Sequence, residues 1–208
     1  MGDIQVTAID DGLIFFQTQD IIQECLVVDA YLVLLERYSR LGSGYIKQIN
    51  MHLIPGPVVT ISGVKNYIYE KEYDEYINRL ITNFKRAEDI CNQYNINMVI
   101  ENTDNIPDYT KRTYEDLYKA GFRFCYDIGH DHLSYDIVWN QLEKLDLPFD
   151  EFHIHDAKDR KKCHLALGEG VLDIAKFKNL AIKNNAYVVL EVKQKSDLDV
   201  SVPLFKKL

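Results

Sequence analysis

Three of the six histidines of this 208-residue chain lie in one short stretch, EFHIHDAKDRKKCHLALGEG, at residues 151–170. His153, His155 and His164 lie there with Asp156, just before two glycines. Imidazole beside carboxylate is typical of divalent-metal sites, although each residue alone could equally serve a structural hydrogen bond in a loop. The stretch predicts a metal site only if acidic residues from elsewhere in the chain reach it.

Further polar residues lie where short apolar, β-branched segments end. Five predicted strands each have one such residue at or just past their end: His52, Glu101, Asp127, His153 and Glu191. From Glu101 onward the separations are 26, 26 and 38 residues, each about one strand-and-helix unit. In a (β/α)₈ barrel the carboxyl ends of the strands meet around one opening, where active sites are built. We therefore expect these side chains to converge.

Two glutamates, one aspartate and one histidine form a mixed oxygen and nitrogen ligand set. Such a set suits Mn²⁺, Zn²⁺, Co²⁺ or Fe²⁺, and also Mg²⁺ where water fills the remaining positions. A metal held there can polarise a carbonyl and a neighbouring hydroxyl, while Glu101 and Glu191 exchange a proton with the adjacent carbon. Because alternate residues of a strand face opposite sides, His153 is predicted to point inward and His155 away.

Purely structural roles are the alternative for the other residues of the stretch 151–170. Asp156 could hold its loop through hydrogen bonds to the backbone, and the glycines of LGEG could serve a tight turn. All six histidines are predicted at or beyond strand ends and none on a helix, a pattern that favours a site over a solvated surface.

The elements that must position these residues alternate along the chain. A helix is predicted over 72–95, where apolar residues recur every three or four positions. Other helices are expected from Asp20 to Gly42, before Gly121 and after the cap Asp173. The predicted strands cover residues 4–9, 13–17, 46–54, 96–102, 122–129, 150–156 and 186–192. Repeated strand and helix indicate a parallel sheet, and no G-x-G-x-x-G follows a strand. We predict an α/β barrel of the TIM type, with residues 1–208 as one domain.

Composition limits the classes of function. The chain is 47% hydrophobic, as in packed globular proteins, and its net charge of −8 creates no field that attracts nucleic acid or an anionic membrane. The four cysteines form no C-x-x-C pair, the N-terminus does not resemble a signal peptide, and no apolar segment could span a bilayer. We expect a cytoplasmic protein with reduced thiols.

Over residues 46–195, the chain resembles the xylose-isomerase-like barrel superfamily in four segments. In chain order these are INMVIEN, FCYDIGH, FHIHDAKDRKKCHLALGEG and VVLEV. That superfamily includes sugar-phosphate isomerases and epimerases, ketose 3-epimerases and endonuclease IV. The resemblance implies that Glu101, Asp127, His153 and Glu191 bind one divalent metal, Mn, Zn, Co or Mg. It also implies that the two glutamates act as acid and base on either face of a sugar-like substrate.

Other residues match substrate contacts or extra ligands of the superfamily. His130 resembles a histidine that binds substrate oxygens, and Arg160 lies one position from a substrate arginine; we assign His52 and His164 to substrate binding as well. In the endonuclease IV branch, His52, His130 and His164 would be zinc ligands. Lys162 stands there in place of an aspartate ligand, and no histidine precedes His52, so a three-zinc centre and a nucleic-acid substrate are not favoured.

The N-terminal part departs from the superfamily pattern, because only about 45 residues remain for the first three strand-and-helix units. The barrel is therefore predicted to be incomplete or shortened at the N-terminus, and a homodimer is expected to cover its open side. The favoured function is a metal-dependent isomerase or epimerase of a small sugar, sugar phosphate or hydroxy-carbonyl compound, through a metal-stabilised enediolate. The alternatives are cleavage of abasic DNA and a non-catalytic barrel that binds a ligand or partner. Residues 55–75 are predicted to form a loop near the substrate, with Tyr67 and Tyr69 more suited to packing than to contact.

Overall fold

The computed structural model describes residues 26–53, 56–103, 107–136, 139 and 147–208. The chain divides into two compact units. Of the described residues, the N-terminal unit holds 26–100 and 107–122, and the C-terminal unit holds 101–103 and those from Arg123 to Leu208. The predicted strands at 4–9 and 13–17, and the expected helix start at Asp20, lie outside the described residues.

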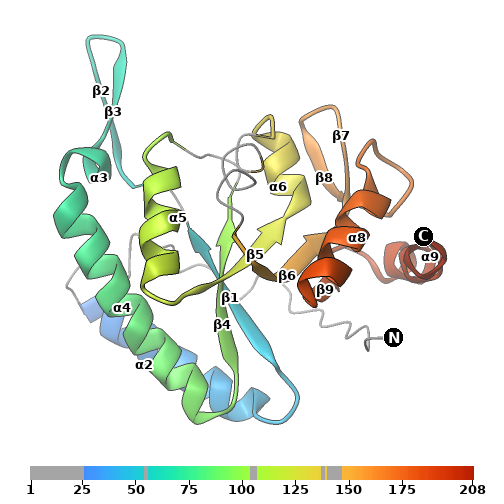
Figure 1. The fold of residues 1–208 in the computed structure, drawn as a ribbon, viewed down its shortest axis with the longest axis horizontal. Helices are drawn as coiled ribbons and strands as arrows, with labels where there is room; N and C mark the ends of the chain where they lie inside the picture. Colours follow the sequence, from blue (N-terminus) through green and yellow to red (C-terminus); the bar gives the residue numbers. More distant parts are fainter. Residues whose placement is uncertain (1–25, 54–55, 104–106, 137–138, 140–146) are drawn as a thin grey trace. The chain divides into compact units, whose positions relative to one another are not determined.

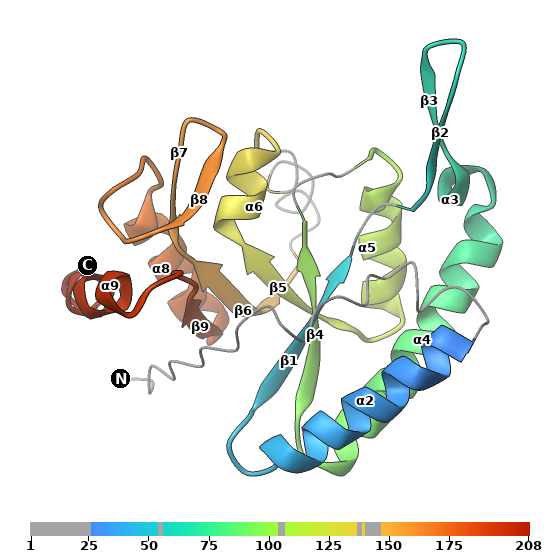
Figure 2. The ribbon, with the colours of Figure 1, turned by 180° about the vertical axis from the view of Figure 1, so that it is seen from behind.

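The N-terminal unit is built on helices α2 (Leu26–Gly42), α4 (Tyr73–Gln93) and α5 (Thr110–Lys119), with strand β1 (Gln48–Leu53) and most of β4 (Asn97–Asn102). Helices α2 and α4 lie side by side (Figures 1 and 2). Arg86 of α4 pairs with Asp29 of α2 at 2.6 Å, and the Tyr31 hydroxyl of α2 contacts Met51 Sδ of β1 at 2.7 Å. These contacts hold the helix pair to the strand.

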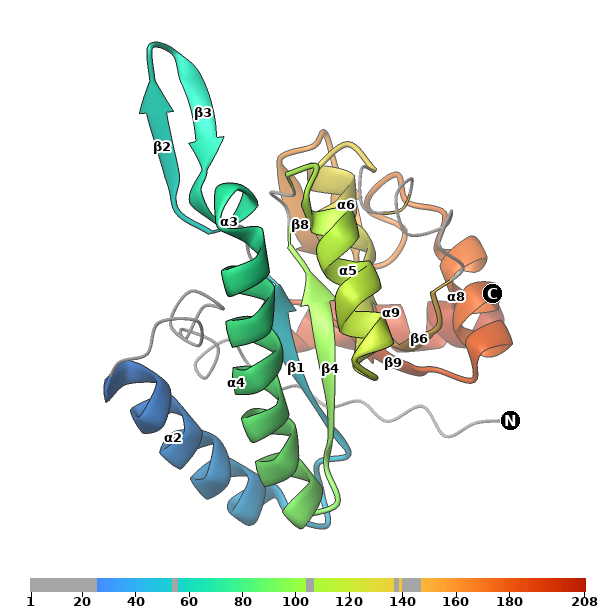
Figure 3. The same ribbon diagram turned by 60° about the vertical axis from the view of Figure 1, so that its left-hand side comes forward.

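A hairpin projects from this unit, away from α4 (Figure 3). It consists of β2 (Val58–Ile61) and β3 (Val64–Tyr67), which pair antiparallel, followed by the short helix α3 (Ile68–Lys71). The predicted loop at 55–75 thus contains regular structure. Tyr69 stacks on Tyr76 with ring centroids 4.5 Å apart, and Tyr67 lies 6.0 Å from Tyr109, so both tyrosines pack within the unit.

The C-terminal unit is centred on three parallel strands in the order β5 (Arg123–Asp127), β6 (Phe149–Ile154) and β9 (Tyr187–Leu190). Among its described residues, the helices with stated bounds are α6 (Ile128–Leu133), α8 (Ile174–Asn184) and α9 (Lys195–Lys207) (Figure 1). Its core gathers aromatic rings around Tyr126, whose centroid lies 5.4 Å from that of Phe149 and 5.7 Å from that of Phe177. Packing of aromatic rings from strands and helix fixes the sheet against α8.

A second antiparallel hairpin follows β6 in the C-terminal unit. It consists of β7 (Asp156–Lys158) and β8 (Lys162–Leu165), with Lys158 opposite Lys162. The chain then passes through the segment LGEG to α8, whose first backbone N–H groups are capped by Asp173, which accepts from the Lys176 N–H at 3.0 Å. This confirms the predicted cap.

Parallel strands alternating with helices confirm the α/β class. The helix predicted at 72–95 occupies Tyr73–Gln93, and Gly121 follows α5 with the positive φ of +92° that favours glycine. The strand predicted at 122–129 is wrong at its end, because β5 stops at Asp127 and α6 begins there. None of the helices in the described ranges combines the length and apolar character that a membrane crossing requires.

Candidate metal centre

Four of the predicted residues lie at the ends of strands, and all four belong to the C-terminal unit. Glu101 is the penultimate residue of β4, and Asp127 is the last of β5. His153 is the penultimate residue of β6, and Glu191 directly follows β9, its N–H donating to the Ile154 carbonyl at 3.2 Å. Asp127 and His153 are register partners, so adjacent strands deliver their side chains to the same edge.

The ring of His153 lies among three carboxylates. Its Nδ1 is 3.1 Å from Glu101 Oε1, 3.2 Å from Glu191 Oε2 and 3.9 Å from Asp127 Oδ2. One ligand atom from each of the four residues lies within 4.8 Å of every other. The four residues, called here the ligand cluster, therefore converge as the spacing along the sequence predicted.

Two buried atoms of the ligand cluster point to a cation. Within the described part of the chain, neither His153 Nδ1 nor Glu191 Oε2 has a hydrogen-bond partner of acceptable geometry. Buried polar atoms are nearly always hydrogen-bonded, and three carboxylates around one imidazole nitrogen repel each other without a positive charge between them. An oxygen and nitrogen donor set of this composition fits a divalent metal such as Zn²⁺ or Mn²⁺.

The electrostatics of the ligand cluster also favour positive charge. Burial alone would raise the pKa of Asp127, but the neighbouring His155 outweighs it and holds that pKa well below its usual range. Burial would lower the pKa of His153, but interactions with Cys125 and Glu101 raise it well above the ordinary value. The carboxylates thus favour one positive charge among them, which a proton on His153 or a metal that displaces this proton can supply.

The pKa values of Glu191 and of the neighbouring His164 are shifted as well. Burial opposes ionisation of Glu191, yet interactions with His153 and His164 lower its pKa to about 2. Burial likewise opposes a charged His164, but contacts with Cys163 and Glu191 raise its pKa to about 10. Glu191 is therefore an anion at neutral pH, as a metal ligand must be.

Two residues that the sequence analysis missed contact members of the ligand cluster. Asn102 binds the backbone of Asp127 twice, accepting from its N–H at 2.8 Å and donating to its carbonyl at 3.0 Å. Glu151 Oε1 lies 2.9 Å from His153 Nε2, which leaves Nδ1 to face the carboxylates. Partners of this kind fix the ring orientation of ligand histidines. Glu151 lies two positions before His153, so strand alternation could have identified it.

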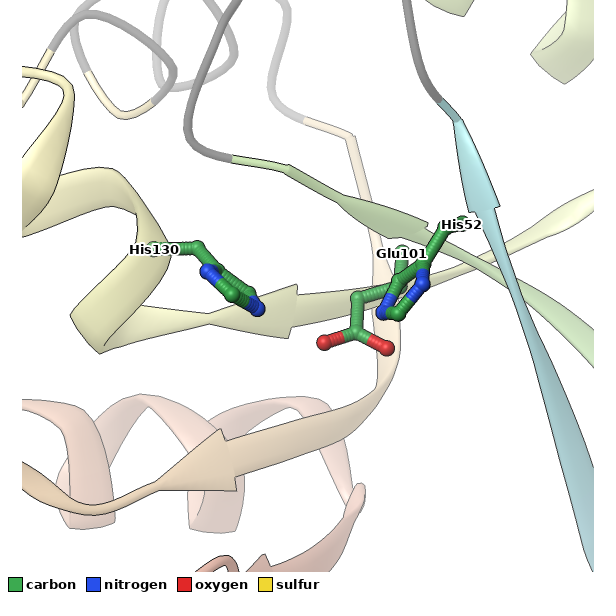
Figure 4. Close-up of side chains that lie close together, drawn as sticks. All are labelled: His52, Glu101 and His130. Atoms are coloured by element: carbon green, nitrogen blue, oxygen red, sulfur yellow. The ribbon is translucent and has the colours of Figure 1, made fainter. Parts of the chain in front are cut away.

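His130 and His164 lie near the ligand cluster in the same unit. The His130 ring extends from α6 on the side of Glu101 (Figure 4), and its centroid is 5.9 Å from that of His164. His164 Nε2 lies 3.4 Å from Glu191 Oε1. Both are half-buried, which suits contact with a substrate. The prediction that no histidine lies on a helix is wrong, because α6 carries His130 and His132.

Arg160 and His52 are the other two predicted substrate residues. Arg160 pairs with Asp136 at 2.8 Å and donates to the His132 carbonyl, so its guanidinium is engaged by its own unit. His52 lies on β1 of the N-terminal unit, with its side chain half-buried. The substrate roles of both residues stay predictions.

The prediction that His155 turns away is wrong. Its side chain is fully buried, its Nε2 lies 3.2 Å from Asp127 Oδ1, and its ring stacks on that of His164 with centroids 4.3 Å apart. Strand alternation failed here because β6 ends at Ile154, so His155 no longer follows the pleat.

The structural role considered for Asp156, holding its loop through hydrogen bonds to the backbone, is confirmed. Asp156 is 2% exposed, and its carboxylate accepts four backbone N–H groups. Oδ1 accepts from Ala157 at 2.9 Å and from Leu172 at 3.1 Å, and Oδ2 accepts from Gly168 and Gly170 at 2.9 Å each. Gly168 has φ +91°, as the predicted tight turn requires. Asp156 therefore anchors the segment that follows β8.

The fold and the ligand cluster together agree with one family of proteins. The chain belongs to the xylose isomerase-like TIM barrel family, whose model matches residues 5–206. The uncharacterized protein MJ1614 of Methanocaldococcus jannaschii is 26% identical over 151 residues, which is 68% of this chain and 57% of that protein. The matched part of the chain thus spans little more than half the length of that relative.

Solved structures share the fold at low sequence identity. A D-tagatose 3-epimerase-like protein has a TM-score of 0.62 at 19% identity, covering 92% of this chain and 73% of the other. The 3-keto-D-glucoside 4-epimerase YcjR of E. coli has a TM-score of 0.61 at 15% identity, covering 92% and 75%. The TTHB071 protein of Thermus thermophilus, soaked with ZnCl₂, has a TM-score of 0.61 at 19% identity, covering 92% and 74%. These likenesses confirm the resemblance to TIM-type barrels.

Proposed function

We propose that the protein is a metal-dependent isomerase or epimerase of a small sugar, sugar phosphate or related hydroxy-carbonyl compound. The observation that carries this proposal is the ligand cluster, in which Glu101, Asp127 and Glu191 surround Nδ1 of His153. Two of the three structural neighbours named above are an epimerase and an epimerase-like protein, and a third was soaked with zinc, which supports the proposal.

The two glutamates of the ligand cluster have the acid and base roles in this reaction. A divalent metal held by the ligand cluster would polarise a carbonyl oxygen and the hydroxyl beside it. Glu101 and Glu191 approach His153 Nδ1 from different strand ends, at 3.1 and 3.2 Å. One carboxylate takes the proton from the carbon next to the carbonyl, and the electron pair of the broken C–H bond moves toward oxygen. The other glutamate, in its protonated form, returns a proton to the same carbon, which inverts the centre. If the proton goes instead to the former carbonyl carbon, the hydroxyl proton passes to the former carbonyl oxygen and the carbonyl moves to the neighbouring carbon.

His130 and His164 are assigned to the substrate oxygens, because both are half-buried imidazoles beside the ligand cluster. His164, next to Glu191, is suited to donate a hydrogen bond to a hydroxyl or carbonyl oxygen. We keep His52 and Arg160 as further candidates for substrate contact. A homodimer, a cytoplasmic location and the absence of a nucleic-acid substrate stay part of the proposal.

Hydrogen exchange into the substrate tests the function whatever product the reaction forms. The chain, loaded with Mn²⁺, Zn²⁺, Co²⁺ or Mg²⁺, is incubated in D₂O with a panel of ketoses, ketose phosphates and small hydroxy-ketones. Loss of the proton signal next to the carbonyl reports proton abstraction. We expect exchange with at least one compound and loss of exchange after removal of the metal by a chelator.

The matched variants are Glu101→Gln and Glu191→Gln, with Glu169→Gln as a control on an exposed glutamate of the same unit. Each of the first two is expected to keep the fold and to lower the exchange rate by about 10²- to 10⁴-fold, because an amide cannot take up the proton. The control is expected to match the unaltered chain. Undiminished exchange in both cluster variants would reject the roles assigned to the glutamates.

A further inference from the structure

Both ring nitrogens of His155 meet polar groups in the interior of the C-terminal unit. The backbone N–H of His164 donates to His155 Nδ1 at 2.8 Å. On the other side of the ring, His155 Nε2 lies 3.2 and 3.3 Å from the two carboxylate oxygens of Asp127. The ring is fully buried and lies so close to Gly129 that a Cβ there would come within 1.8 Å of His155 Cε1. Its position is therefore closely constrained.

These contacts define the tautomer of His155. A backbone N–H can only donate, so Nδ1 must carry a lone pair and cannot carry a proton. The longer approach of Nδ1 to the Asp156 carbonyl, at 3.3 Å, cannot compete with the donated bond at 2.8 Å. The ring proton is then on Nε2, where it points at a carboxylate that can only accept. His155 therefore donates to Asp127 through Nε2.

The tautomer of His155 bears on whether this residue binds a metal or supports Asp127. His155, His164 and Glu191 offer ligand atoms within 4.8 Å of one another, which alone would suggest a second cation site beside the ligand cluster. A histidine binds a metal through an unprotonated nitrogen. In His155 the nitrogen that faces the carboxylates carries the proton, and the unprotonated one is taken by the His164 N–H. Both ring nitrogens of His155 are therefore already engaged, one by the His164 N–H and the other by Asp127.

Resting on the metal centre of the proposed function, we infer that His155 is a positioning residue that orients Asp127. Asp127 Oδ1 accepts from the His130 N–H at 2.6 Å and lies next to His155 Nε2. The His130 N–H holds Oδ1, His155 Nε2 lies against both carboxylate oxygens, and Oδ2 is on the side of His153 Nδ1. A donor behind a ligand carboxylate fixes its direction and raises the affinity for the metal.

The same ring also supports His164. The two imidazoles are stacked with centroids 4.3 Å apart and planes inclined by 7°, and the backbone of His164 is tied to the His155 ring. His164 adopts a φ of +59°, which is unfavourable for a side chain of this size and needs support from its surroundings. His155 thus connects a proposed metal ligand to a proposed substrate residue.

Three variants separate positioning of Asp127 from simple filling of space. In His155→Gln the side-chain amide lies about as far from the backbone as Nε2 and can still donate to Asp127. In His155→Asn the amide lies about where Nδ1 was and can accept from the His164 N–H, but it does not reach Asp127. His155→Leu fills space and makes neither bond. His132→Asn, at another buried histidine of the same unit, is the matched control.

The measurement is the affinity of each metal-free protein for Zn²⁺, by titration against a competing chelator, with folding checked by circular dichroism. We expect His155→Asn and His155→Leu to weaken binding by about 10- to 100-fold. His155→Gln is expected to keep most of the affinity, and His132→Asn all of it. The Co²⁺ absorption spectrum should change in His155→Asn and not in His132→Asn, because the geometry of Asp127 changes only in the former.

The outcomes distinguish the inference from the proposed function. His155→Asn binding Zn²⁺ as tightly as the unaltered chain would overturn the positioning role. Two ions per unaltered chain, with one lost in all His155 variants, would make His155 a ligand and overturn it as well. Tight binding of one ion without any hydrogen exchange would overturn only the proposed activity. No metal binding by the unaltered chain would reject both.

Discussion

Replacing Asp156 by asparagine tests how the segment after β8 is anchored. Each carboxylate oxygen of Asp156 accepts two backbone N–H groups, so whichever oxygen becomes an amide nitrogen, two N–H groups lose their acceptor and face a donor. Hydrogen bonds to a charged acceptor contribute about 1.5–3 kcal/mol each, and the two bonds lost share one carboxylate. We therefore expect the free energy of unfolding to fall by about 3–5 kcal/mol.

The assay is urea unfolding followed by circular dichroism, with Asp159→Asn as the control. Asp159 lies in the turn of the same hairpin and is exposed, so its replacement makes the same change of charge without removing an anchor. Exposed substitutions of this kind usually stay within about 0.5 kcal/mol. If both variants unfolded at the same urea concentration, the four hydrogen bonds of Asp156 would not carry the stability argued for them.

Two further predictions concern buried positions. Gly129→Ala is expected to lower the free energy of unfolding by about 1–3 kcal/mol, because the added Cβ would meet the buried His155 ring; an unchanged urea midpoint would contradict this close approach. Burial raises the pKa of the Cys91 thiol to about 11, so the unfolded chain releases this proton first. The contribution of the protonated Cys91 thiol to the free energy of unfolding is complete below the ordinary thiol pKa of about 9 and is lost as the pH rises through 11. The alkaline loss of stability in urea should therefore be smaller in Cys91→Ala, and equal losses in both proteins would refute the assignment.

The alternation of the longer helices with the strands β1, β4, β5, β6 and β9 follows from local sequence, whereas the two hairpins and α6 do not. The three- and four-residue spacing of apolar side chains located α4, and Asp173 located the start of α8. The convergence of Glu101, Asp127 and His153 also followed, because parallel strands bring residues one strand-and-helix unit apart to the same edge. Local patterns of this kind depend on few long-range contacts.

The supporting contacts of the site could not be predicted in the same way. The bond between His155 and Asp127 joins residues 28 positions apart and forms only because the chain leaves the pleat after Ile154. The two bonds of Asn102 to the Asp127 backbone depend on how the end of β4 approaches β5. Such contacts arise from the detailed course of the backbone after each strand, which alternation of side chains does not describe.

Glu101 has a special place in the order of the chain. The C-terminal unit takes residues 101–103 from a stretch that otherwise belongs to the N-terminal unit, so the ligand cluster is not encoded in one continuous segment. A fragment that starts at Arg123 would carry Asp127, His153 and Glu191. It would lack Glu101 and also Asn102, which makes two hydrogen bonds to the Asp127 backbone. A cut before Arg123 would therefore separate Glu101 from the other three residues of the ligand cluster.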